Sequence, residues 1–185
     1  MKRLAFLLLT LMLFGAVDQA MAQSSKNETR KELKKGRRVE RKALRKLKGS
    51  EVSKISKASF KEDYGDVPNV IWTRSDYFDE ANFIIDEQNM TAYYDYNGKL
   101  VGTTYEVNFE DIPLLGQQNI KRYYNGARIG KTIFFEDNED IDTDMILYKV
   151  QFEDADNYFV ELTKGKSRFI VIVDARGKTG FFKQL

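Results

Sequence analysis

Glycine-lysine pairs are the residues whose spacing could do chemistry in this chain, because a Gly-Lys-Ser/Thr tripeptide closes the loop that cradles phosphate in many nucleotide-binding proteins. The tripeptide occurs three times, beginning at Gly130, Gly165 and Gly177. Such a loop also needs a glycine five residues before the Gly-Lys pair, so that backbone N–H groups can wrap the phosphate. Those positions hold Asn125, Val160 and Ile172. The sequence therefore predicts turns between strands, and no phosphate site.

A second pattern, Asp-x-x-Gly-Lys, occurs at Asp95–Lys99 and again at Asp174–Lys178, 79 positions later. In the first copy, Asn97-Gly98 is a dipeptide that accepts the positive φ angles of a two-residue hairpin turn. Both copies lie between segments rich in aromatic and β-branched residues, which are typical of strands. We expect one piece of architecture used twice, not a ligand site.

Few residue types in this sequence could carry out catalysis. The chain has no histidine and no cysteine, and so lacks the commonest general base, the strongest nucleophile, thiolate ligands and disulfides. Asp140, Asp142 and Asp144 alternate like the start of a calcium loop, but Met145 stands where glycine is required and Gln151 where glutamate would close the site. We expect a protein without catalytic residues, cofactor or metal, in which loop carboxylates are solvated.

The first residues have the pattern of a secretory signal. Lys2 and Arg3 precede an apolar run over 4–17 that is too short to span a membrane, and alanines at 20 and 22 stand at the two positions that signal peptidase reads. The sequence predicts a signal peptide over 1–22 and a periplasmic or secreted mature protein beginning at Gln23.

Residues 23–50 form a basic arm, with 12 Lys or Arg against three Glu (12 − 3 = +9), whereas residues 51–185 carry 16 basic and 24 acidic residues (16 − 24 = −8). Val39, Ala43 and Leu47 lie four apart and predict a basic helix with a thin apolar seam. The candidate polyanion-binding residues are Lys34, Lys35, Arg37, Arg38, Arg41, Lys42 and Arg45.

Three roles for this arm remain open. It could bind an anionic membrane surface or polysaccharide, act as a solvated, partly disordered tether, or fold onto its own acidic domain. Nucleic acid is not an expected partner, because a signal peptide sends the chain away from it.

Residues 51–185 have the length of one domain of the α+β class. A helix is predicted from Ser53 to Gly65, and a second over 111–126 with Pro113 in its first turn. Four strands should follow the first helix, and strands over 128–137, 144–154, 157–165, 167–175 and 177–183 the second. The order predicts two tandem helix-plus-antiparallel-sheet repeats, about 53–109 and 110–185.

The stretches "VPNVIW", "AYYDYNGKLVG", "FEDIP" and "VIVDARGK", in this order, resemble the bacterial periplasmic proteins called β-lactamase-inhibitor-like and PepSY-like. The resemblance covers about 53–185 and excludes the basic arm. It implies tandem helix-plus-sheet units, a curved sheet, no cofactor, and binding of another protein through an aromatic-rich sheet face. The sequence departs from the namesake inhibitor in having no cysteines.

Aromatic residues are plentiful, with 13 Phe, 10 Tyr and one Trp. Tyr93, Tyr94 and Tyr96 are so close in sequence that alternation must send them to both sheet faces. If the helices cover one face, the other presents tyrosine, a residue enriched in interfaces, to water. The candidate partner surface is Tyr77, Phe78, Tyr93, Tyr94 and Tyr96, while Trp72 shares a face with Val70 and is expected in the core.

These observations predict an exported, non-enzymatic protein-binding module whose partner is another envelope or secreted protein, with inhibition or modulation of an envelope hydrolase suggested by the resemblance. The alternative is an envelope attachment protein that binds anionic lipid or polysaccharide through its basic arm.

Overall fold

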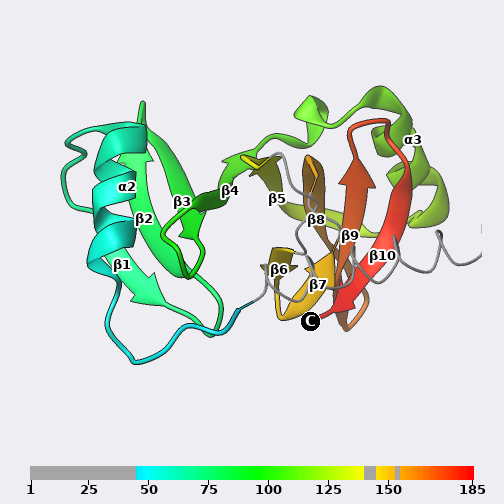
Figure 1. Cartoon of the computed structure of the whole chain (residues 1–185). Helices are drawn as coiled ribbons and strands as arrows, with labels where there is room; N and C mark the ends of the chain where they lie inside the picture. Colours follow the sequence, from blue (N-terminus) through cyan, green and yellow to red (C-terminus); the bar gives the residue numbers. More distant parts are fainter. Residues whose placement is uncertain (1–44, 140–144, 153–154) are drawn as a thin grey trace, which may run out of the picture. The chain divides into compact units, whose positions relative to one another are not determined.

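A computed structural model describes residues 45–139, 145–152 and 155–185 (Figure 1). Helix α2 (Lys54–Tyr64) begins after Ser53, whose Oγ accepts a hydrogen bond from the Ile55 N–H at 3.1 Å, and ends at Gly65 with a φ of 77°. Helix α3 (Leu114–Tyr123) follows a 3₁₀ turn at Phe109–Asp111. Pro113 lies immediately before α3, where its missing N–H costs nothing.

Eight of the described strands form one antiparallel sheet in the order β1-β2-β3-β4-β5-β8-β9-β10. Their bounds are β1 Ile71–Arg74, β2 Asp79–Ile85, β3 Gln88–Tyr94, β4 Leu100–Val107, β5 Arg128–Asp137, β8 Asn157–Lys164, β9 Ser167–Asp174 and β10 Thr179–Gln184. The α+β class and the large antiparallel sheet are confirmed. Helix α2 precedes β1–β4 and α3 precedes β5. The tandem-repeat hypothesis stays a prediction.

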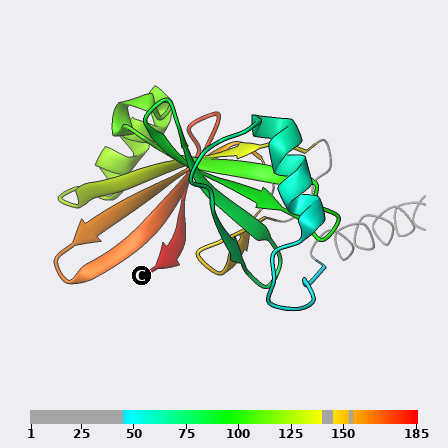
Figure 2. The same ribbon diagram turned by 90° about the vertical axis from the view of Figure 1, so that its left-hand side faces the viewer.

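Both helices cover the same face of this sheet. Phe60 of α2 packs with Ala81 and Tyr94, whereas Ile120 of α3 packs with Val160 in a second cluster. The strand pairing places the two clusters on one face, because residues opposite one another in antiparallel strands point to the same side of the sheet. Ala92 pairs with Thr103, and Thr103 with Glu136. Thr132 is four residues from Glu136 on β5, so it points to the same face, and it pairs with Val160. Figure 2 shows how the twist fans these strands out.

The opposite face is partly covered by a small hairpin, β6 (Met145–Leu147) and β7 (Val150–Phe152). Its Met145 and Phe152 are buried in one cluster with Tyr93, Phe135 and Phe159 of the large sheet. The cluster therefore joins strands β3, β5 and β8 through the hairpin. Residues 140–144 and 153–154, which flank the hairpin, lie outside the described residues, as do Asp140, Asp142 and Asp144 of the calcium-loop comparison.

The single strand predicted over 144–154 is wrong. Tyr148 and Lys149 have φ angles of 52° and 64° and form the turn between β6 and β7. The alternation of Ile146, Tyr148, Val150 and Phe152 suggested one long strand, but two positive φ angles in succession reverse the chain there, as in a two-residue hairpin turn.

The two Asp-x-x-Gly-Lys segments are hairpin turns with the same hydrogen bonds. Asp95 N donates to Lys99 O at 2.9 Å and Gly98 N to Asp95 O at 3.0 Å, and the equivalent distances at Asp174 are 3.0 and 2.9 Å. Gly98 has a positive φ and Asn97 does not. The loop therefore has three residues and ends in a glycine bulge. The two-residue turn predicted at Asn97-Gly98 is wrong.

These glycines also let each turn approach the first turn of a helix. A Cβ on Gly98 would lie 3.0 Å from the Ser56 N of α2, and one on Gly177 would lie 2.7 Å from the Gly116 N of α3. The lysine and glycine of the motif therefore serve turn geometry and helix packing. Both copies of the motif have this structural role, and not a phosphate-binding one.

Candidate protein-binding face

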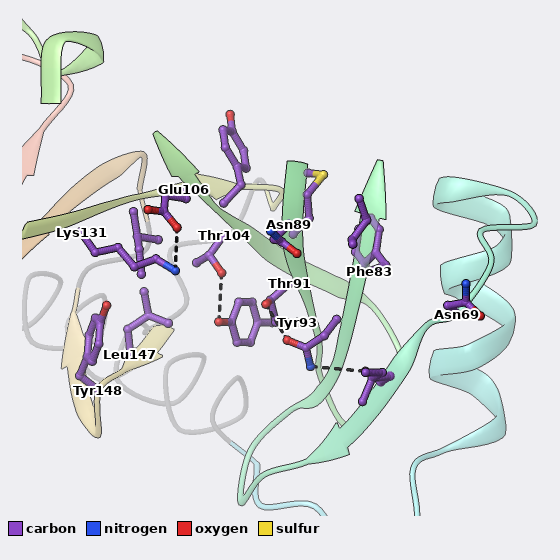
Figure 3. A pocket seen from close by; sticks show the side chains of 16 residues that line it. Asn69, Phe83, Asn89, Thr91, Tyr93, Thr104, Glu106, Lys131, Leu147 and Tyr148 are labelled. Carbon is purple, nitrogen blue, oxygen red and sulfur yellow. Dashed lines mark hydrogen bonds and ion pairs between the residues drawn. The ribbon is translucent and has the colours of Figure 1, made fainter. Parts of the chain in front are cut away.

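A groove of about 520 Å³ opens on the sheet face opposite the helices, beside the β6–β7 hairpin (Figure 3). Ile71 and Ile84 lie in its lining and are 69% and 58% exposed. Tyr148 and Leu147 of the hairpin stand across from Tyr93 and Thr104 of the sheet, as Figure 3 shows. The groove is thus lined by exposed isoleucines, by tyrosines and by polar side chains such as Asn82 and Thr91.

The polar groups of the groove bond to one another. Thr91 donates to the Asn82 amide oxygen at 2.9 Å, and the Tyr93 and Thr104 hydroxyls lie 3.2 Å apart. Burial raises the pKa of Tyr93 to about 12, so its phenol is neutral at physiological pH. These groups are hydrogen-bonding and packing groups; none has the arrangement of a nucleophile beside a base. The lining thus offers apolar surface and hydrogen-bonding groups to a binding partner.

A second pocket of about 800 Å³ lies on the other side of the hairpin, at the start of β2. Tyr77, Phe78, Glu80, Tyr93 and Tyr148 are among its lining residues. Tyr93 and Tyr148 line both pockets, so the hairpin divides one aromatic surface into two.

The structure brings three of the five predicted surface residues together and separates the other two. Tyr77, Phe78 and Tyr93 belong to the cluster under the hairpin. Tyr94 points to the helix face, where it is fully buried and its hydroxyl donates to Asp63 at 3.0 Å. Tyr96 lies in the β3–β4 turn.

Burial further limits which of these residues can meet a partner. Phe78 is 4% exposed and Tyr93 is 9% exposed, because the hairpin covers the face that was expected to be open. Tyr94 is a core residue, whereas the buried Phe78 and Tyr93 form part of the pocket walls. Trp72 is half-buried against Phe60, with ring centroids 5.5 Å apart, as its expected core position requires.

Ile71, Ile84 and Tyr148 are among the groove residues that the sequence-based surface did not include. Ile71 and Ile84 could have been found from period two, because each neighbours a residue on the helix face, Trp72 and Phe83. No local sequence pattern indicates that Tyr148 belongs to the groove, because its position depends on the β6–β7 hairpin turn.

The end of the basic arm contacts the domain. Arg45 lies 4.9 Å from the ring centroid of Tyr96, and the Lys46 ammonium bonds Asp76 at 3.0 Å and lies 5.6 Å from the Tyr77 ring centroid. Residues 45–48 are not helical and Leu47 N donates to Asp76 O, so the predicted arm helix does not include Leu47. The other six candidate arm residues lie outside the described residues.

Solved structures similar to this one include proteins of Bacteroides. A BLIP-like protein of Bacteroides fragilis is 14% identical, with a TM-score of 0.56 over 73% of this chain and 87% of its own. The fold is BLIP-like. A DUF2874 family protein of Bacteroides uniformis is 11% identical, with a TM-score of 0.59 over 72% and 90% of the two chains. A proposed periplasmic protein of Bacteroides eggerthii is 8% identical, with a TM-score of 0.58 over 73% and 88%.

The BLIP-like fold agrees with the β-lactamase-inhibitor-like resemblance of the sequence. No protein-family model and no curated protein matches the chain. In the part of the chain that the structure describes, no helix is long and apolar enough to cross a membrane, and no group of three or more acidic side chains is arranged to hold a metal ion.

Proposed function

We propose that this is an exported, non-enzymatic protein-binding module that holds another envelope or secreted protein on the groove face of its sheet. The observation that carries the proposal is the pair of isoleucines, Ile71 and Ile84, exposed beside the tyrosine-lined groove. Two large apolar side chains at the mouth of a groove with aromatic walls are the composition of an interface centre. Export is supported by the signal-like residues 1–22.

The test compares binding by the wild-type chain and by the variant Ile71→Asp/Ile84→Asp. Both side chains are exposed, so the variant should keep its fold and its thermal midpoint. Mature protein is immobilised and exposed to an envelope extract of the producing organism, and a retained protein is purified and titrated by calorimetry. Each isoleucine buried in a complex contributes about 1.5–3 kcal/mol. The variant should therefore bind at least about tenfold more weakly.

The matched control is Leu114→Asp/Phe181→Asp, which places two aspartates at residues that are 67% and 60% exposed outside the groove lining. It should bind like the wild type. Equal loss of binding in both variants, or in neither, would contradict the proposal. Retention that needs residues 23–44 and disappears at high salt would assign binding to the arm, because such contacts are screened.

Inhibition of an envelope hydrolase is the finer form of this proposal. Purified wild-type protein at micromolar excess should slow at least one enzyme from a panel of periplasmic peptidases and β-lactamases, and the Ile71→Asp/Ile84→Asp variant should slow it less. An unaffected panel would remove inhibition and leave the binding function in place.

A further inference from the structure

We propose that the second pocket binds a cationic side chain, arginine or lysine, of the partner protein, with Glu80 as its counter-charge and tyrosine rings as its walls. The inference rests on the proposed function, since it names the chemistry that the partner presents. The pocket has a volume of about 800 Å³, which is ample for a guanidinium or ammonium group and its aliphatic stem.

Glu80 is the carboxylate of the second pocket that would bind the cation. It lies on β2 directly opposite Tyr93 of β3, so both side chains point to the pocket face. None of the ion pairs among the described residues involves Glu80. Burial raises its pKa, and a hydrogen bond with Ser75 only partly opposes that effect. A half-buried carboxylate without a cation gains more from an arriving positive charge than a solvated one does.

The other charged groups of the lining do not neutralise Glu80. Asp76 is already bonded to Lys46 at 3.0 Å. Lys149 is exposed at the turn of the β6–β7 hairpin and forms no ion pair among the described residues. The tyrosine rings of the lining offer negatively polarised faces.

The molecule already holds a lysine in this way at the rim of the same pocket. The Lys46 ammonium bonds the Asp76 carboxylate and lies 5.6 Å from the ring centroid of Tyr77. Asp76 and Tyr77 both line the pocket. Glu80 with Tyr93 offers a second carboxylate-and-tyrosine pair, and none of the ion pairs among the described residues supplies it with a cation. Carboxylate and aromatic face together favour a cation over a neutral side chain of similar length.

The first measurement uses two blocked tripeptides as probes, acetyl-Gly-Arg-Gly-amide and acetyl-Gly-Gln-Gly-amide, titrated into the isotope-labelled mature chain at low salt. The arginine peptide should shift the amide resonances of Glu80, Tyr93 and Tyr148, and should bind about tenfold or more tightly than the glutamine peptide. Equal binding of the two peptides, or shifts confined to other residues, would overturn the inference.

The second measurement uses Glu80→Gln, with Glu62→Gln, at an exposed residue of α2 that lines neither pocket, as the matched control. Glu80→Gln should lose the preference for arginine while keeping its thermal midpoint, and Glu62→Gln should keep the preference. An unchanged preference in Glu80→Gln would overturn the inference. The two proposals can fail separately: a partner that depends on Ile71 and Ile84 and binds Glu80→Gln normally contradicts only the cation pocket. An arginine preference that depends on Glu80 without any such partner contradicts the proposed function.

Discussion

Replacing Asp79 by asparagine should be among the most damaging single changes in this domain. Asp79 is fully buried and binds Arg74 with both oxygens, Oδ1 to Nε at 2.7 Å and Oδ2 to NH2 at 2.8 Å. Oδ2 also accepts hydrogen bonds from the Ser53 N–H at 2.9 Å and the Ser56 hydroxyl at 2.8 Å. One carboxylate thus ties the start of α2 to strands β1 and β2.

The free energy of unfolding should fall because Asp79→Asn leaves Arg74 without its charge partner. The Arg74 side chain is only 11% exposed, so water can compensate for little of that loss. Breaking a buried ion pair by removing one member costs about 3–5 kcal/mol. At roughly 2–4 °C per kcal/mol for a domain of this size, the thermal midpoint should fall by about 6–20 °C. Asparagine also turns an N–H₂ group toward a donor, so the hydrogen bonds to Arg74 cannot both be kept.

Urea unfolding monitored by circular dichroism measures the loss directly. The control is Asp66→Asn, which removes an ion pair with Lys61 whose side chains are 67% and 83% exposed, and it should leave the midpoint unchanged. The double variant Arg74→Met/Asp79→Leu should recover part of the lost stability, since it removes both charges but leaves the Ser53 N–H and the Ser56 hydroxyl without their acceptor. A cost below about 1 kcal/mol for Asp79→Asn would refute the reasoning, because it would mean that the pair contributes no more than a surface pair.

The Arg74–Asp79 ion pair also predicts that the domain loses stability in acid. Burial works to raise the pKa of Asp79, but the hydrogen bonds from Arg74, Ser53 and Ser56 outweigh it and hold the pKa below its usual value. The stabilisation is therefore complete above the unfolded pKa of about 3.9 and is lost as the pH falls through the lower folded value. The wild type should lose stability below about pH 4 more steeply than Asp79→Asn does.

Two further outcomes test the packing. Gly102→Ala would place a Cβ 2.3 Å from the Phe135 ring and should cost about 1–3 kcal/mol in urea unfolding, whereas Gly180→Ala, with its nearest contact at 3.7 Å, should cost less. Because burial raises the pKa of Tyr93 to about 12, its contribution is complete below the unfolded pKa of about 10 and is lost as the pH rises through 12, so Tyr93→Phe should resist alkali better. Equal alkaline unfolding of both proteins, followed by ultraviolet absorbance, would contradict this.

Most of the large sheet could be predicted because its strands have strong local signals. The segments around β2 and β4 are rich in β-branched and aromatic residues, and turn formers separate them. Two hairpin turns carried no such signal, since Asp86-Glu87 and Tyr148-Lys149 take positive φ angles without glycine or asparagine. The first of these lies at the end of the stretch over 77–87 that was predicted as one strand, whereas the second lies in the middle of the strand predicted over 144–154.

The candidate face was harder to predict, because it depends on which side of the sheet each tyrosine takes. Alternation correctly separates Tyr93 from Tyr94, but it cannot say which one faces α2. That choice comes from the register of β3 against β2, where Ala92 and Ala81 make room for Phe60. The position of the β6–β7 hairpin over Tyr93 is a long-range contact that no local pattern encodes.

The β6–β7 hairpin has a consequence for how the domain comes apart. Its buried side chains pack on Phe78 and Tyr93, which precede α3, and on Phe135, Phe159 and Ile170, which follow it. Without it, β4 pairing with β5 would be the main link between the two ends of a sheet whose order otherwise follows the chain. With it, opening either end exposes the same apolar cluster, so amide hydrogens of β2 and β9 should exchange in a single cooperative unit.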